Sequence, residues 1–83
     1  MKNYISTNKA IETLEKLQQR IDEKITDICE KMDAIEERAA DADRDLTRAE
    51  QDRFDAYDEV VDDLRAEWDE VQNAIDYLMD YRF

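Results

Sequence analysis

Apolar residues recur along two stretches of the chain with the alternating three- and four-residue spacing of helices packed as a left-handed coiled coil. In the first stretch, one heptad position is apolar except for Gln18, and its members are Ile11, Ile25, Met32, Ala39 and Leu46. The other position holds Leu14, Ile21, Ile28, Ile35 and Ala42. In the second stretch, the two positions hold Phe54, Val61, Trp68 and Ile75, and Tyr57, Leu64, Val71 and Leu78. The pattern predicts two long helices.

The two stretches are out of phase by one residue, because continuing the first register would place Arg53 instead of Phe54 in the core. Near this slip, Thr47 and Glu50 have the spacing of a capping box. We therefore predict a turn near residues 43–46 that joins two antiparallel helices.

These helices are expected at about residues 8–42 and 47–81. The candidate N-cap residues of the first helix are Ser6, Thr7 and Asn8. The fold class is all-α, an antiparallel two-helix coiled-coil hairpin, and residues 1–83 form one domain. The alternative is one unbroken helix of about 75 residues that dimerises with itself.

Folding back at the turn pairs residues whose numbers sum to about 89. Ile21 then meets Trp68, and Ile28 meets Val61. Outside the seam, two oppositely charged pairs can approach, Lys24 with Glu67 and Asp22 with Arg65. On one side, the apolar stripe is widened by Leu17, Val60, Ala74 and Tyr81. A hairpin buries only a narrow seam, so this widened stripe favours a homodimeric four-helix bundle.

Composition excludes most other classes of structure and of chemistry. The chain has no glycine and no proline, which removes the residues most used in tight turns and nucleotide-binding loops. It has no histidine, and its single cysteine, Cys29, has no neighbouring base and is interpreted as a packing residue. Trp68 is interpreted as a core residue whose indole N–H needs a hydrogen-bond acceptor. We predict neither enzymatic activity nor a cofactor nor a metal site.

Negative charge is concentrated in the second half of the chain. Residues 41–83 hold 15 acids and 5 bases, whereas residues 1–40 hold 9 and 7. The net charge of −12 predicts repulsion from nucleic acid and from anionic membranes, and no apolar run is long enough to span a bilayer. We expect a cytoplasmic protein.

Aspartates recur every seven residues in the second helix, which places them on one face. Aspartate is a poorer helix former than glutamate, and like charges three or four residues apart destabilise a helix, so solubility alone is a weak explanation for them. The predicted acidic face consists of Asp55, Glu59, Asp62, Asp63, Asp69, Glu70 and Asp76. A rod with such charges resembles one side of a nucleic-acid duplex.

The C-terminal residues form a second candidate surface. Tyr77, Met79, Tyr81 and Phe83 cannot all face the seam of one helix. They either close the open end of the hairpin by packing near Tyr4 and Ile5, or they form an apolar anchor for another protein.

A family resemblance covers about residues 36–75. The stretch Arg44-Asp45-Leu46-Thr47-Arg48-Ala49-Glu50, followed by Phe54, Asp55, Val61 and Leu64, resembles the N-terminal scaffold-like (delta) segment of tailed-phage major capsid proteins. That resemblance implies a helical hairpin from a phage or prophage, which we expect in the host cytoplasm.

Two functions remain open from the sequence. The first is an inhibitor that binds the basic surface of a host nucleic-acid-binding protein or defence nuclease, as DNA-mimic, anti-restriction and anti-CRISPR proteins do. The second is a scaffold or capsid-assembly-like module, or a structural coiled-coil homodimer, that binds through apolar residues.

Overall fold

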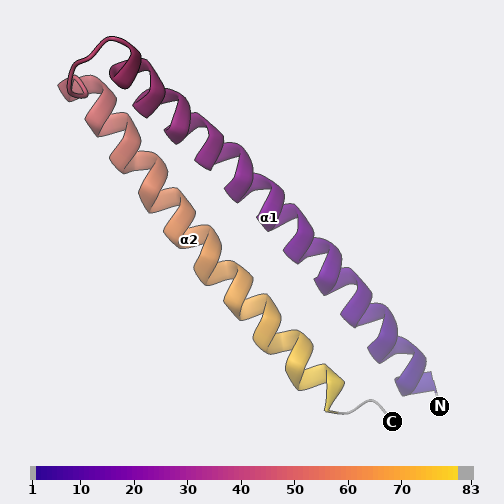
Figure 1. Ribbon diagram of the computed structural model, residues 1–83. Coiled ribbons are helices and arrows are strands. Elements are labelled where there is room, and N and C mark those ends of the chain that lie inside the picture. The colour runs from indigo at the N-terminus through magenta and orange to yellow at the C-terminus, as the bar shows by residue number, and fades with distance from the viewer. Residues whose placement is uncertain (1, 81–83) are drawn as a thin grey trace.

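The computed structural model is an antiparallel hairpin of two long helices (Figure 1). Helix α1 spans Lys2–Asp41 and helix α2 spans Arg48–Met79, and they form a rod 63 Å long and 16 Å wide. The structure describes the backbone of residues 2–80 and the side chains of residues 7–80. Lys2 and Met79 lie at one end of the rod, the open end, and the loop lies at the other. The predicted all-α hairpin is confirmed, and the unbroken single helix is wrong.

A hydrogen bond between the helices fixes their register. The side-chain amide of Gln18 donates to Oε1 of Gln72 over 2.8 Å, and Gln72 in turn donates to Asp76 over 2.9 Å. The numbers of the first pair sum to 90, one more than the predicted 89. Gln18, which interrupts the apolar seam, therefore has a polar counterpart that specifies the alignment, as buried asparagines do in coiled coils.

The predicted start of the first helix is wrong. Helix α1 begins at Lys2, so Ser6, Thr7 and Asn8 lie inside the helix and not at its start. Residues 2–5 include no glycine or proline, so nothing in the backbone stops the helix from extending past a residue that favours a cap. The other boundaries differ from the expected ones by one or two residues, as the ends at Asp41 and Met79 show.

Helix α1 ends in a Schellman motif built without glycine. The N–H of Arg44 donates to the carbonyl of Ala39 over 3.1 Å, and the N–H of Asp43 donates to that of Ala40 over 3.0 Å. The motif requires a left-handed backbone at Asp43, which has φ of 50°. Glycine usually fills this place, and aspartate is one of the few other residues that tolerate it.

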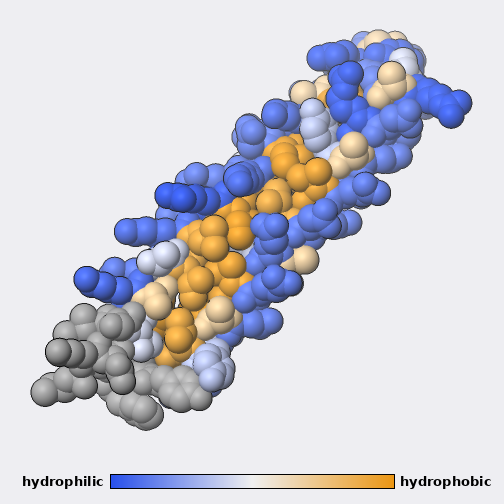
Figure 2. Space-filling model, turned by 180° about the vertical axis from the view of Figure 1, so that it is seen from behind, coloured by the Kyte–Doolittle hydropathy of each residue, from blue (hydrophilic) through white to orange (hydrophobic). Residues whose placement is uncertain are grey.

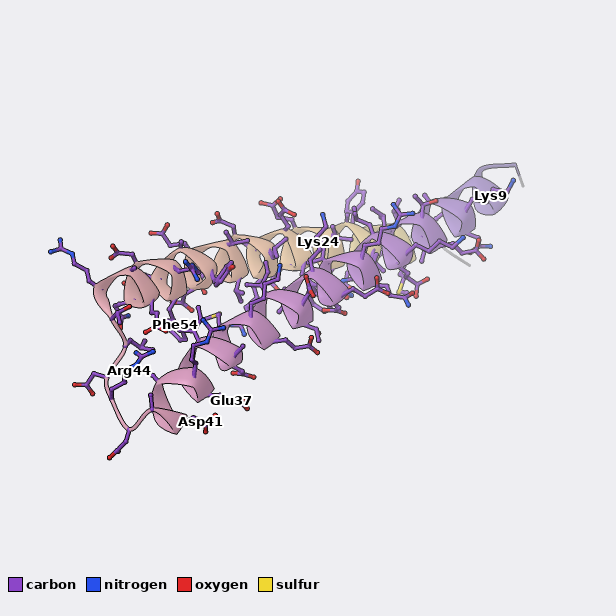
Figure 3. The ribbon with its side chains drawn as sticks, turned by 90° about the horizontal axis from the view of Figure 1, so that it is seen from above. Lys9, Lys24, Glu37, Asp41, Arg44 and Phe54 are labelled. Atoms are coloured by element: carbon purple, nitrogen blue, oxygen red, sulfur yellow. The ribbon has the colours of Figure 1, made fainter. Side chains whose placement is uncertain are left out.

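Helix α2 begins with the predicted capping box. The N–H of Glu50 donates to the hydroxyl of Thr47 over 3.1 Å, and the N–H of Thr47 donates to the Glu50 carboxylate over 2.9 Å. Arg44, labelled in Figure 3, reaches the same carboxylate from the loop with bonds of 2.6 and 3.3 Å. The guanidinium and the Thr47 N–H lower the pKa of Glu50 to about 2. The carboxylate thus joins the loop to the first turn of α2.

The core is a single row of side chains along the seam. The buried apolar residues in the described part of the chain are Ile11, Ile21, Ile35, Ala39, Val61 and Ile75. One heptad position of α2 remains half-buried at Tyr57, Leu64, Val71 and Leu78. Each helix has only one neighbour, so much of the seam faces water. Trp68 is also half-buried, and its enclosed indole nitrogen has no hydrogen-bond acceptor among the described residues.

Candidate protein-interaction surfaces

All seven residues of the predicted acidic face are exposed, but the structure does not place them together. Helical periodicity relative to the buried Val61 and Ile75 separates them into three groups. Four aspartates lie on one flank of the hairpin: Asp55, Asp62, Asp69 and Asp76. Asp63 and Glu70 lie toward the opposite flank, and Glu59 lies on the outer edge of α2. The stripe of four is therefore the coherent part of the prediction.

Helix α1 adds carboxylates to the flank that carries these four aspartates. The charge of each helix taken separately does not predict this. In an antiparallel pair, the residues that directly follow a seam residue on one helix lie on the same side of the hairpin as those that directly follow a seam residue on the other. The surface formed in this way, here named the acidic flank, comprises Glu12, Glu15, Asp22, Asp33, Glu36, Asp55, Asp58, Asp62, Asp69 and Asp76, all exposed. Along the part of the rod that holds these ten carboxylates, the basic residue on this flank is Arg65.

The acidic face is not neutralised within the described part of the chain. The ion pairs among residues 7–80 join Lys31 to Asp27 over 3.7 Å and Arg44 to Glu50 over 2.6 Å, and neither includes a residue of the predicted acidic face. Asp55 and Asp76 each accept a bond of 2.9 Å from a glutamine amide one turn earlier. The carboxylates therefore keep their charge available for another molecule.

The two ion pairs expected from the register do not form. Neither Lys24 with Glu67 nor Asp22 with Arg65 comes within ion-pair distance in the region described. All four side chains are exposed. Ion pairs between exposed side chains contribute little because water solvates each charge and ordering long side chains costs entropy. The register is set instead by the seam and by Gln18.

The opposite flank carries exposed apolar side chains. Leu17 is 42 % exposed and Val60 is 44 % exposed, and Ala10 and Ala74 lie at equivalent positions. These four residues are here named the apolar flank. Figure 2 shows this side of the rod, where a continuous apolar stripe lies between two polar margins. The hairpin thus has two unlike sides, one acidic and one apolar.

The C-terminal candidates are only partly described. Tyr77 is 63 % exposed and Met79 is 44 % exposed, so neither is enclosed by the hairpin. Tyr81 and Phe83, and the side chains of Tyr4 and Ile5, lie outside the described residues. The two described members are therefore accessible to another molecule.

The described residues contain neither a metal-binding cluster nor a membrane-spanning helix. Within the described residues, no group of three histidine, cysteine or acidic side chains is arranged to hold a metal ion. Cys29 is a half-buried free thiol. Neither helix, as far as the structure describes it, has an apolar segment long enough to cross a bilayer.

No protein family, curated protein or solved structure matches this chain in sequence or fold comparisons.

Proposed function

We propose that the protein is a non-enzymatic interaction module whose acidic flank binds a basic, nucleic-acid-binding surface of another protein. The observation that carries the proposal is the spacing of its charges. The ten carboxylates of the acidic flank lie within about 36 Å of the rod, at 1.5 Å per helical residue, or about one per 3.6 Å. One strand of duplex DNA carries a phosphate per roughly 3.4 Å of axis. A groove lined with Lys and Arg for one strand would meet a similar charge density here.

Rigidity also supports this function. Aspartate and glutamate side chains on a continuous helix are held at fixed intervals, and aspartate has few rotamers to immobilise on binding. Binding would release counterions and be steered by long-range attraction, so affinity should fall steeply with salt. The resemblance to phage delta segments makes a host defence nuclease, of the type that anti-restriction or anti-CRISPR proteins inhibit, a suitable target.

The test compares two variants of equal net charge. In the first, Asp62, Asp69 and Asp76 are changed to lysine on the acidic flank. In the second, Glu23, Glu30 and Glu37 are changed to lysine on the outer edge of α1, where Figure 3 shows Glu37 pointing away from α2. Both variants change the net charge from −12 by the same amount. Any difference between them therefore reports position.

Each immobilised protein is incubated with a bacterial lysate, and retained proteins are eluted first with duplex DNA and then with rising NaCl. We expect wild type and the outer-edge variant to retain nucleic-acid-binding proteins that DNA displaces, and the acidic-flank variant to lose them. Equal retention by both variants would show that the acidic flank is not the binding surface.

A second candidate function is an assembly module that binds through apolar residues at the open end. The exposure of Tyr77 and Met79 favours it. In that case, binding would survive the three acidic-flank reversals and persist in high salt, and Tyr77→Ala would abolish it. The same lysate experiment, repeated with Tyr77→Ala, separates the two functions.

A further inference from the structure

The apolar flank leaves two large apolar side chains exposed in the hairpin. Leu17 and Val60 are more than 40 % exposed, and the half-buried seam residues Leu64, Val71 and Leu78 face the same side. Figure 2 shows an apolar stripe along this side of the rod. An apolar stripe bordered by polar residues is the usual appearance of a surface that another protein covers. The question is which molecule covers it.

The charged margins of the stripe indicate the answer. On the α1 margin, Arg20 and Lys24 are cations without an ion pair among the described residues. Glu67 and Glu70 lie at the same levels on the α2 margin, and Asp63 lies on that margin closer to the loop. One margin of this side is therefore basic and the other acidic. A surface with this pattern is complementary to itself under a suitable twofold rotation.

We propose that a second copy of this chain covers the apolar flank and forms an antiparallel four-helix bundle, with the twofold axis parallel to the long axis of the rod. This rotation places α1 of each copy over α2 of the other, with both open ends together. Arg20 then faces Glu70 of the second copy, Lys24 faces Glu67, and Leu17 packs near Ala74. The small Ala74 side chain allows the helices to approach closely.

The alternative twofold axis, perpendicular to the rod within the interface, is disfavoured by charge. It would place α1 over α1 and α2 over α2. Lys24 would then face Lys24 of the second copy, and the acids of the two α2 helices would face each other. With either axis, both acidic flanks point outward, on opposite sides of the bundle. Two chains of net charge −12 can therefore associate without bringing their acidic flanks together.

The available area is sufficient for a stable dimer. The rod has extents of 63, 16 and 14 Å, so one long side of it covers on the order of 1,000 Å² per copy. Standard interfaces bury roughly 800 Å² per partner. The proposal does not rest on the proposed function, because it uses the flank opposite to the acidic one.

The first test is the mass of the particle in solution. Sedimentation equilibrium of wild type at about 100 µM should give twice the chain mass of 9.9 kDa, as expected for low-micromolar or tighter association. The double variant Leu17→Gln/Val60→Gln should be monomeric. The matched control Thr26→Gln/Ala66→Gln, at exposed positions away from this flank, should remain dimeric. A monomeric wild type would overturn the proposal, as would a dimer that survives the flank substitutions.

A charge-reversal experiment keeps the test valid if the flank variant fails to fold. Arg20→Glu/Lys24→Glu makes both margins acidic, and Glu67→Lys/Glu70→Lys makes both basic. Each variant should be monomeric alone, and an equimolar mixture should form a heterodimer. Circular dichroism checks that each variant is helical. If neither variant loses self-association, the charged margins do not contact each other.

The orientation of the axis is tested by cross-linking. In a Cys29→Ser background, Leu17→Cys and Ala74→Cys proteins are mixed and oxidised. The parallel axis predicts a disulfide-linked heterodimer in the mixture and far less product from either protein alone. Efficient cross-linking of Leu17→Cys to itself only would contradict this axis. The reversals at Asp62, Asp69 and Asp76 should leave dimerisation unchanged, so failure of one proposal does not imply failure of the other.

Discussion

Replacing Asp43 with glycine should stabilise the hairpin, although it introduces the most flexible residue into a chain that has none. Asp43 has φ of 50°, and the two Schellman hydrogen bonds depend on that conformation. A left-handed backbone costs an ordinary L-residue about 1–2 kcal/mol, and an aspartate somewhat less. Its carboxylate makes no hydrogen bond or ion pair with the described residues, so the substitution removes no contact.

Three effects determine the size of the change. Glycine removes most of the left-handed penalty, but it loses about 0.5–1 kcal/mol more backbone entropy on folding. Removing a negative charge beside the C-terminus of α1 contributes roughly 0.3–1 kcal/mol in the favourable direction, because that end of a helix carries partial negative charge. The net expectation is a gain of about 1 kcal/mol. For a domain of this size, that corresponds to roughly 4–8 °C in Tm.

Urea unfolding, followed by circular dichroism at fixed protein concentration, measures the effect. Two controls assign its cause. Ala40→Gly places glycine in the last turn of α1, where φ is helical, and should destabilise by about 0.5–1 kcal/mol. Asp43→Asn removes the charge and keeps tolerance of the left-handed region, so it should show only the charge effect. If Asp43→Gly lowers stability as Ala40→Gly does, the reasoning from backbone conformation is refuted.

Two further predictions concern contacts between segments. Glu50→Gln should destabilise the hairpin at neutral pH. The native pKa of Glu50 is about 2, below its ordinary 4.5. The difference in free energy of unfolding from wild type should therefore be full above about pH 4.5 and disappear as the pH falls through 2. Unfolding curves of both proteins at several pH values test this, and a constant difference would contradict it. The double variant Gln18→Leu/Gln72→Leu should be more stable than either single variant, with a coupling of about 0.5–1.5 kcal/mol, because a single change leaves one amide without its counterpart. Additive effects in that double-mutant cycle would show that the 2.8 Å bond contributes nothing.

Local patterns predicted the elements that depend on neighbouring residues in the sequence. The seam, the capping box at Thr47 and the register to within one residue all follow from spacing, which a helix converts directly into geometry. The start of α1 was not predicted, because a residue that favours the cap position can also lie inside a helix that continues past it. The positive φ at Asp43 was equally hidden, since without glycine no residue marks a Schellman motif.

The acidic face shows what spacing within one helix leaves out. Asp55, Asp62, Asp69 and Asp76 share a side of α2, and this much follows from the seven-residue repeat. That Asp63 and Glu70 face the other flank, and that acids of α1 join the stripe, depends on how two helices pack. Sequence neighbours can therefore contribute to different surfaces, and residues far apart can contribute to one.

This division gives the charges of α2 two separate tasks. In the proposed dimer, Glu70 faces a basic margin of a second copy, whereas Asp62 and Asp69 remain outward for another protein. Each dimer would then present two acidic flanks on opposite sides, so one dimer could bind two target molecules at once, although not two sites on one flat surface. Disrupting the dimer through Leu17 and Val60 should therefore abolish this bridging of two target molecules while leaving the affinity of a single flank unchanged. An acidic protein that bound only as a monomer would show no such difference.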